Sequence, residues 1–272
     1  MAPSTVRDRI MAALLLPLRI YTKYSPFRRG RGLFIRPIEA LKRRGWPAPV
    51  VLVGDRLQME FEPSLIGWTC FERGTWEPEQ TAIISDSLSP GAIVLNVGAN
   101  TGYYALLAGS LVAPQGHVHA FEIQPAIIEI LRRNVARNNL QDVVTIVTAG
   151  CFSSERDATI HCPGDPGSAS VAFNESGVRV RLTTVDHYAA INGLSRVDLL
   201  LIDTEGADFE VLKGAATVLT RFRPMVVAEA HLLARFGSSE DEMITFMSQY
   251  GYSVAALNSE FSRDLLFLPP KA

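Results

Sequence analysis

The chain has 272 residues, of which 47% are hydrophobic and 20% charged, and its formal net charge is −2 at pH 7. These proportions are typical of a folded globular protein and exclude an intrinsically disordered or collagen-like chain. The three cysteines, Cys70, Cys151 and Cys162, are too few and too scattered for a disulfide framework, which indicates a reducing compartment.

The first 45 residues carry a positive charge that the net value hides. They contain eleven Lys and Arg residues against two acidic ones, a balance of +9, while the rest of the chain carries −11. The apolar run from Ile10 to Leu18 is shorter than the roughly 20 residues of a spanning helix. Basic residues follow this run where a signal peptide would have its cleavage site. We therefore expect a cytoplasmic protein.

Two interpretations of residues 1–45 remain open. In one, they form an amphipathic basic segment that lies on an anionic membrane, at its inner face, or meets an acidic substrate. In the other, which we favour, they form a helical cap with solvated arginines and a buried apolar face made of Leu14, Leu15, Leu18 and Ile38. Nucleic acid is not an expected partner, because the arm lacks interleaved aromatic residues and the body is acidic.

From residue 91 onward, apolar strand-like runs alternate with helical stretches. Strands are expected at 92–97, 117–122, 143–148, 197–203, 225–229, 252–257 and 265–268. Helices are expected at 103–113, around 127–135, at 240–250, and after the fourth strand with Val211, Ala215, Val218, Leu219 and Phe222 on one face. The alternation predicts an α/β fold with a mostly parallel sheet and helices on both faces.

Residues 151–185 interrupt this alternation. They are rich in Gly, Pro, Ser and Asp, with short β-like pieces at 158–162 and 178–183, and are expected to form a β-hairpin insertion. The predicted organisation is then a basic arm or helical cap over residues 1–52, a segment over 53–90 that packs on the sheet, and a main domain over 91–272.

A glycine turn and an acidic residue follow the first two strands of the main domain. Gly98 and Gly102 frame the strand-to-helix turn NVGANTG, which lacks the middle glycine of the dinucleotide fingerprint. Glu122 lies 20 residues beyond Gly102, at the end of the next strand. An acid in that place can accept hydrogen bonds from both hydroxyls of a ribose. Together they indicate a nucleoside-type cofactor.

Two further groups are candidates for chemistry at the same edge of the sheet. His231 and Glu229 are two residues apart and share a face of a strand, where the carboxylate supports the imidazole as a proton acceptor. Asp203 and Glu205 could act as a base, orient a hydroxyl, or bind a hard cation such as Mg²⁺. For Glu205 we favour capping of the following helix. No metal is predicted, because the spacing of Cys151, His161 and Cys162 matches no zinc pattern.

Several of these segments resemble the FkbM family of S-adenosylmethionine-dependent methyltransferases. They are NVGANTGYYA, HAFEIQP, VDLLLIDTEGADFEVLKGA, RPMVVAEAH and, before the first strand, RGTWEPEQTAIISDSLSPGAIV. The resemblance covers about residues 53–268 and is most specific around IDTEG and VLKGA. It implies a Rossmann-like class I methyltransferase fold and transfer of a methyl group to a hydroxyl of a sugar-containing, glycolipid or secondary-metabolite acceptor.

The resemblance also implies roles for individual residues. The cofactor site would comprise Glu77, Asn96, Gly98, Ala99, Asn100, Gly102, Tyr103, Glu122 and Asp203, with Glu122 on the ribose. The catalytic candidates are His231, Asp203 and Glu229. Trp76 is expected near the pocket and Trp68 in ordinary packing.

Two positions depart from the family pattern, since Asn96 replaces the usual acid of the glycine motif and Leu201 replaces a common lysine. Two alternatives remain, a non-catalytic scaffold of the same fold and a nicotinamide-dependent oxidoreductase.

Overall fold

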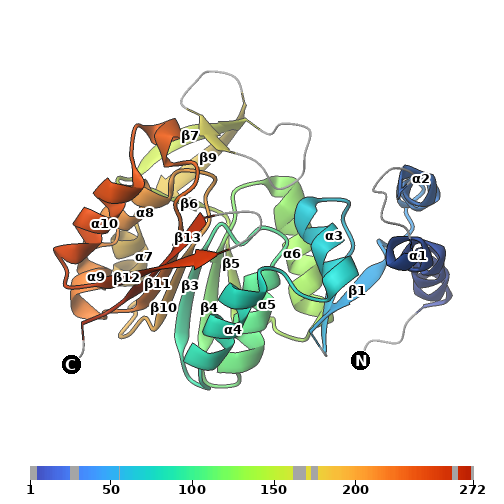
Figure 1. Cartoon of the computed structure of the whole chain (residues 1–272), viewed down its shortest axis with the longest axis horizontal. Helices are drawn as coiled ribbons and strands as arrows, with labels where there is room; N and C mark the ends of the chain where they lie inside the picture. Colours follow the sequence, from blue (N-terminus) through green and yellow to red (C-terminus); the bar gives the residue numbers. More distant parts are fainter. Residues whose placement is uncertain are drawn as a thin grey trace. The chain divides into compact units, whose positions relative to one another are not determined.

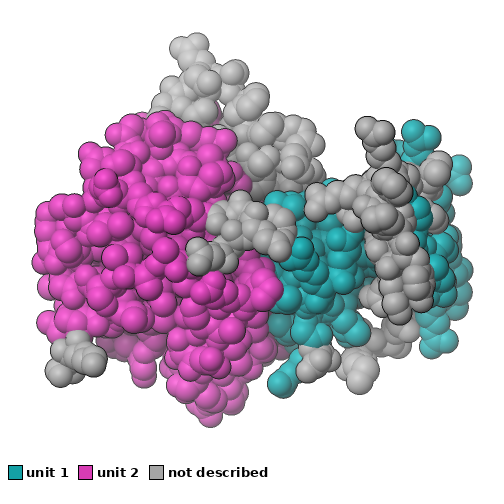
Figure 2. All heavy atoms as spheres, viewed as in Figure 1, with its two compact units in different colours: residues 1–76, 136–138 teal, residues 77–135, 139–272 magenta. Residues whose placement is uncertain are grey.

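The computed structural model describes residues 5–24, 31–54, 56–161, 170–172, 177–258 and 263–270 (Figure 1). The chain divides into two compact units, which Figure 2 colours separately: residues 1–76 with 136–138, and residues 77–135 with 139–272. This division falls between the expected boundaries at residues 52 and 90. The organisation into an arm or cap over residues 1–52, a segment over 53–90 and a main domain over 91–272 stays a prediction.

The described residues of the first unit form the helices α1 (Val6–Tyr24), α2 (Arg31–Lys42) and α3 (Leu65–Arg73), and a hairpin of the antiparallel strands β1 (Val50–Val53) and β2 (Leu57–Glu60). Helix α1 packs against α2, α3 and β1. In the described part of the chain, no helix has the length and apolar character needed to cross a bilayer.

Most of the side chains expected to form the buried apolar face of residues 1–45 are buried in this unit. Leu15, Leu18 and Ile38 are buried, together with Met11, while Leu14 is half-buried. Next to them, Phe61 and Trp68 pack edge to face with ring centroids 5.2 Å apart. Trp68 therefore has the packing role predicted for it.

The second unit is built on a seven-stranded sheet in the order β12-β13-β11-β10-β3-β4-β5. Its strands are β3 (Ile93–Val97), β4 (His117–Phe121), β5 (Val144–Val147), β10 (Leu199–Ile202), β11 (Met225–Glu229), β12 (Ser253–Asn258) and β13 (Arg263–Leu268). The strands from β11 to β5 run parallel, whereas β13 is antiparallel to both of its neighbours. The mostly parallel α/β sheet that the sequence predicts is confirmed.

Helices cover both faces of this sheet, as Figure 1 shows. On one face lie α4 (Pro78–Ser87), α5 (Tyr103–Val112) and α6 (Pro125–Arg137). On the other lie α7 (Val185–Ile191), α8 (Asp208–Lys213), α9 (Ala216–Arg221) and α10 (Glu240–Ser248), and a short helix η1 (Leu233–Phe236) follows β11. A core on the second face joins Leu95, Leu200, Val226, Val211, Val218 and Met243. Both faces are thus shielded, and ligands have access at the ends of the strands.

The single helix predicted after β10 is wrong, because the chain forms α8 and α9 with a break at Gly214. A Cβ atom at Gly214 would lie 2.2 Å from the carbonyl oxygen of Phe152, so the chain passes too close to this backbone for a side chain. The new helix start is held by Asp186, whose carboxylate accepts hydrogen bonds from the N–H groups of Thr217 and Val218, both at 2.8 Å. The spacing of apolar residues in the sequence does not indicate this break between α8 and α9.

The predicted hairpin insertion is confirmed, since β7 (Arg156–His161) pairs antiparallel with β9 (Val178–Thr183). With β6 (Gly150–Cys151) and β8 (Ser170–Ala172), these strands form a second sheet in the order β6-β9-β7-β8. Strand β6 follows β5 directly, so this small sheet begins at the carboxyl edge of the large one. Cys162 lies outside the described residues.

Candidate functional site

The order of the strands fixes where a ligand can approach the second unit. The chain passes from β3 to β4 and β5 on one side, and only later to β10 and β11 on the other. The switch point therefore lies between β3 and β10, and the loops that follow these two strands meet there. The contact is close: a Cβ atom at Gly98 would lie 1.7 Å from the backbone oxygen of Asp203. With φ at +83° as well, this position requires glycine.

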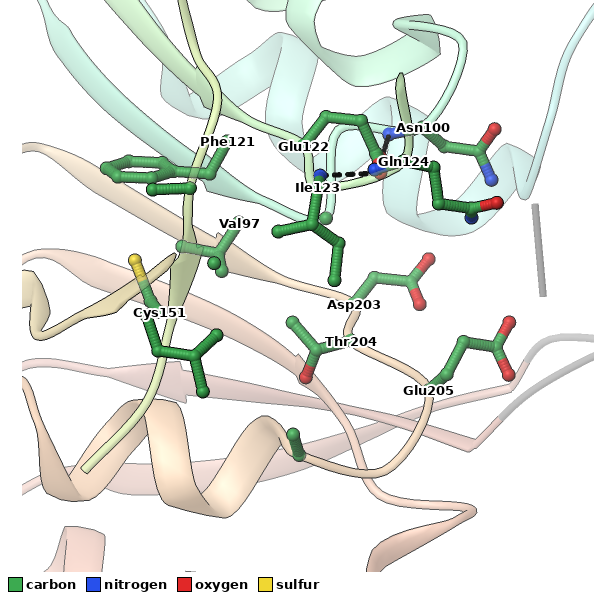
Figure 3. A pocket seen from close by; sticks show the side chains of 15 residues that line it. Val97, Asn100, Phe121, Glu122, Ile123, Gln124, Cys151, Asp203, Thr204 and Glu205 are labelled. Carbon is green, nitrogen blue, oxygen red and sulfur yellow. Dashed lines mark hydrogen bonds between the residues drawn. The ribbon is translucent and has the colours of Figure 1, made fainter. Parts of the chain in front are cut away.

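Glu122, which directly follows β4, is held by the backbone around it. Its Oε2 accepts a hydrogen bond from Asn100 N at 2.9 Å, and its Oε1 accepts from Ile123 N at 2.8 Å and Gln124 N at 2.9 Å (Figure 3). Burial raises the pKa of this carboxyl, while the three N–H donors act in the opposite direction. The carboxylate is thus fixed beside the glycine turn, with lone pairs left for a ligand.

A pocket opens at this switch point. The residues that line it are Val97, Gly98, Asn100, Phe121, Glu122, Ile123, Gln124, Ala149, Gly150, Cys151, Leu182, Asp203, Thr204, Glu205 and Ala207. They come from the ends of β3, β4 and β10, from the segment between β5 and β6, and from β9 of the insertion (Figure 3). One part of the wall is apolar, with Phe121, Ile123, Cys151 and Leu182, and the other carries carboxylates and amides.

Of the predicted cofactor residues, the structure brings Gly98, Asn100, Glu122 and Asp203 into the lining of the pocket. The other predicted residues are Glu77, Asn96, Ala99, Gly102 and Tyr103, and they do not belong to this lining. Their part in a cofactor site stays a prediction.

Three of these residues have surroundings that the structure defines. Asn96 is buried on β3, and its Oδ1 has no hydrogen-bond partner among the described residues. The Tyr103 hydroxyl lies 3.0 Å from Thr81 Oγ1. Glu77 is buried in the left-handed region with φ at +38°, and its Oε2 accepts a hydrogen bond of 2.7 Å from the Tyr104 hydroxyl.

Asp203 is the most electrostatically perturbed group of the pocket. Its side chain is exposed and lines the pocket (Figure 3). Desolvation by the protein around the pocket raises the pKa of the Asp203 carboxyl well above its usual range. The neighbouring carboxylates of Glu229, Asp208, Glu77 and Glu205 raise it further. A concentration of negative charge of this kind favours a positively charged ligand group.

Glu229 and His231 form the pair that their spacing predicted. His231 Nδ1 lies 3.0 Å from Glu229 Oε1, while Glu229 Oε2 is buried without a hydrogen-bond partner among the described residues. The imidazole is 45% exposed. Neither residue lines the pocket, but Glu229 is near enough to raise the pKa of Asp203. The pair thus lies at the rim of the carboxylate cluster.

The expectation that Glu205 caps the next helix is wrong. Glu205 has φ at +56°, and α8 begins three residues later without a side-chain cap. The loop is instead held by Asp208, whose carboxylate accepts from Thr204 N at 3.2 Å and Gly206 N at 3.1 Å. Burial raises the pKa of Asp208 to about 7, with Glu229 adding to the effect. Glu205 faces Arg235, with Oε2 at 3.7 Å from Nη1.

Sequence reasoning missed the apolar wall of the pocket. Ile123 and Gln124 follow the ribose acid directly, so their place next to it could have been inferred from Glu122. Leu182 belongs to the insertion and has no local signal, because only the pairing of β9 with β6 brings it here. Trp76 is buried but does not line the pocket. No group of three His, Cys, Asp or Glu side chains in the described ranges is arranged to hold a metal ion.

Comparison with known proteins identifies a family. The model of the methyltransferase FkbM domain matches residues 96–254, which is more than half of the chain and includes most of the elements that build the pocket. Among solved structures, the methyltransferase FkbM from Methylobacillus flagellatus KT is similar with a TM-score of 0.48 and 14% identity, covering 66% of this chain and 44% of that one.

Two curated relatives match shorter stretches. A protein-L-isoaspartate O-methyltransferase from Methanothrix thermoacetophila is 35% identical over 83 residues, covering 30% of this chain and 40% of that protein. The methyltransferase sdnD from Sordaria araneosa is 29% identical over 161 residues, covering 47% of this chain and 62% of that protein. The chain thus matches less than two thirds of the length of either relative.

Proposed function

Because the chain belongs to the FkbM methyltransferase family, with the class I methyltransferase fold, we propose that it transfers a methyl group from S-adenosylmethionine to an acceptor hydroxyl. The observation that carries this proposal is the convergence of Gly98, Glu122 and Asp203 in one pocket at the topological switch point. The name of the O-methyltransferase relative supports transfer to an oxygen atom, without indicating a hydroxyl.

The residues of the pocket fit this cofactor at its different ends. Glu122 retains lone pairs to accept from ribose hydroxyls, and the neighbouring apolar wall with Ile123 and Leu182 suits a flat aromatic base. The carboxylate cluster around Asp203 suits the positively charged methionine end. Asn96 contributes no charge at the glycine motif, so Asp203 and its neighbours would supply the charge that the motif itself lacks.

When bound, S-adenosylmethionine supplies an electrophilic methyl group on a positively charged sulfur. The task left to the protein is to hold the acceptor oxygen in line and to remove its proton. His231 is suited to that task, because an ionised Glu229 can only accept at Oε1 and so places the imidazole proton on Nδ1. The Nε2 lone pair then remains available as the base.

The acceptor would present hydroxyl groups, as sugar-containing molecules, glycolipids and many secondary metabolites do. Glu205 and Gln124 offer acceptor oxygens on the polar side of the pocket, and such groups select hydroxyls by hydrogen bonding. The proton of a hydroxyl must leave as the oxygen attacks, and we assign this step to the Glu229–His231 pair, whose Oε1 and Nδ1 lie 3.0 Å apart.

The test is a transfer assay with a panel of sugar, glycolipid and polyketide acceptors, with the methylated atom located by NMR. We expect methylation on oxygen, and a kcat that falls by about 10²–10⁴ in His231→Gln while cofactor affinity is kept. His187→Gln is the matched control, because His187 is also a partly exposed histidine beside a glutamate, with Nε2 at 3.3 Å from Glu155. Methylation on nitrogen or carbon, or an unchanged kcat in His231→Gln, would contradict the proposal.

A further inference from the structure

Helix α1 has apolar residues on two opposite faces, although its packing uses only one. The buried face carries Met11, Leu15 and Leu18, which pack within the first unit. The opposite face is exposed and carries Val6, Ile10, Ala13, Leu16, Pro17 and Ile20, with Arg9 among them. Of these, Val6, Ile10, Leu16 and Ile20 are 73%, 42%, 58% and 54% exposed. One apolar face is enough to hold a helix on a core, so folding does not explain the second.

Basic residues lie at both ends of α1 and in the segment that follows it in the sequence. Arg7 and Arg9 lie in the first turns of α1, and Arg19 and Lys23 lie near its end. Further exposed arginines, Arg36, Arg43 and Arg44, belong to α2 and the turn after it. The single acidic residue of α1, Asp8, accepts hydrogen bonds from the backbone and hydroxyl of Thr5. The region therefore joins exposed apolar side chains to a local charge of +9 over residues 1–45.

We propose that the exposed face of α1 docks on an anionic lipid bilayer, with Ile10, Leu16 and Ile20 in the interfacial layer and the arginines among the headgroups. A second copy of this chain would bring one +9 segment against another, and like charges repel. A nucleic acid would engage the arginines and leave the apolar face in water. An anionic bilayer matches both features.

The test is sedimentation of the full chain with vesicles of phosphatidylcholine alone or mixed with phosphatidylglycerol. We expect binding to the anionic vesicles, little binding to the neutral ones, and a loss of binding as salt rises from about 0.1 M to about 1 M and shortens the screening length from ~10 to ~3 Å. The triple variant Ile10→Ser, Leu16→Ser, Ile20→Ser should bind the anionic vesicles at least about tenfold more weakly.

The matched control replaces three exposed apolar residues of the second unit, with Ile191→Ser, Val254→Ser and Leu268→Ser, whose side chains are 67%, 41% and 43% exposed. This control should bind like the unchanged protein, and circular dichroism should give the same helix content for all three chains. The proposal is overturned by absence of binding to anionic vesicles, by binding that ignores lipid charge and salt, or by equal binding of the α1 variant. It is also overturned if, without lipid, the chain forms a dimer that the α1 variant abolishes.

Discussion

Gly98 is the residue at which the two loops of the switch point touch. Alanine there would combine a left-handed backbone with a Cβ atom 1.7 Å from the Asp203 oxygen, so one of the loops must move. We expect Gly98→Ala to lower the free energy of unfolding by at least about 2 kcal/mol and to abolish cofactor binding. Urea unfolding and calorimetric titration measure the two effects.

Gly237→Ala provides the control for Gly98→Ala. Gly237 has a similar left-handed φ of +69°, but nothing lies within 4 Å of the position of its Cβ. Gly237→Ala should therefore lower the free energy of unfolding only by the cost of a left-handed backbone at alanine, about 1 kcal/mol. Equal losses for the two variants would contradict the close contact between the loops after β3 and β10.

The raised pKa of Asp203 leads to a prediction about proton release on ligand binding. Desolvation and neighbouring carboxylates raise its pKa well above the usual range in the free protein. A positively charged ligand favours the ionised form and lowers that pKa, so binding should release protons and tighten as pH rises. Calorimetric titration with S-adenosylmethionine near pH 7, in two buffers with different ionisation heats, measures the release.

The proton release should disappear in Asp203→Asn. It should persist in Asp157→Asn, which removes an exposed carboxylate of the insertion, on β7. Proton uptake on binding would contradict the assignment of Asp203 to the cationic end of the ligand, and so would equal release from all three proteins.

At the scale of elements, the start of α9 depends on a side chain from another helix. Asp186 of α7 satisfies the N–H groups of Thr217 and Val218, which have no acceptor within their own helix. We expect Asp186→Ala to lower the free energy of unfolding by about 1–2 kcal/mol. Asp142→Ala, at an exposed carboxylate after α6, should change it by less than about 0.5 kcal/mol. Urea unfolding of both variants measures these changes. An equal loss of unfolding free energy in the two variants would contradict the capping role of Asp186.

The elements that could be predicted from the sequence are those with a local signal. Buried parallel strands are continuous apolar runs, and this is why β3, β4, β10 and β11 were found nearly at their observed bounds. The glycine turn and Glu122 are read in the same local way, and both reach the pocket. The break at Gly214 and the position of Leu182 depend on Phe152 and on strand pairing in the insertion, which are contacts between distant segments. Local patterns carry no information about them.

For the molecule as a whole, buried carboxyls determine the pH dependence of stability. Burial raises the pKa of Glu122 and Asp208 above their values in an unfolded chain, and that of Asp208 from 3.8 to about 7. The native state therefore holds more protons than the unfolded one between about pH 4 and 7. The stability that these groups contribute is present below pH 4 and is lost as pH rises through 7. We expect the free energy of unfolding to fall by about 1–3 kcal/mol across this window.

Urea unfolding at several pH values measures this fall, and Asp208→Asn should make it smaller. The groups with lowered pKa, such as Glu240 beside Arg263, act in the opposite sense but lose their contribution only at lower pH. A free energy of unfolding that rises steadily from pH 4 to pH 7 would contradict the burial of these two carboxyls.

The proposed methyl transfer depends most directly on whether the pocket binds S-adenosylmethionine. Isothermal titration of the full chain with S-adenosylmethionine and, separately, with NAD tests this, with Glu122→Gln as the variant. Glu122→Gln keeps the size of the side chain but replaces one acceptor oxygen, now bonded to backbone N–H, by a donor. We predict saturable binding of S-adenosylmethionine to one site, at least about tenfold weaker binding in Glu122→Gln, and no binding of NAD. Binding of NAD in place of S-adenosylmethionine, or of neither, would contradict the account.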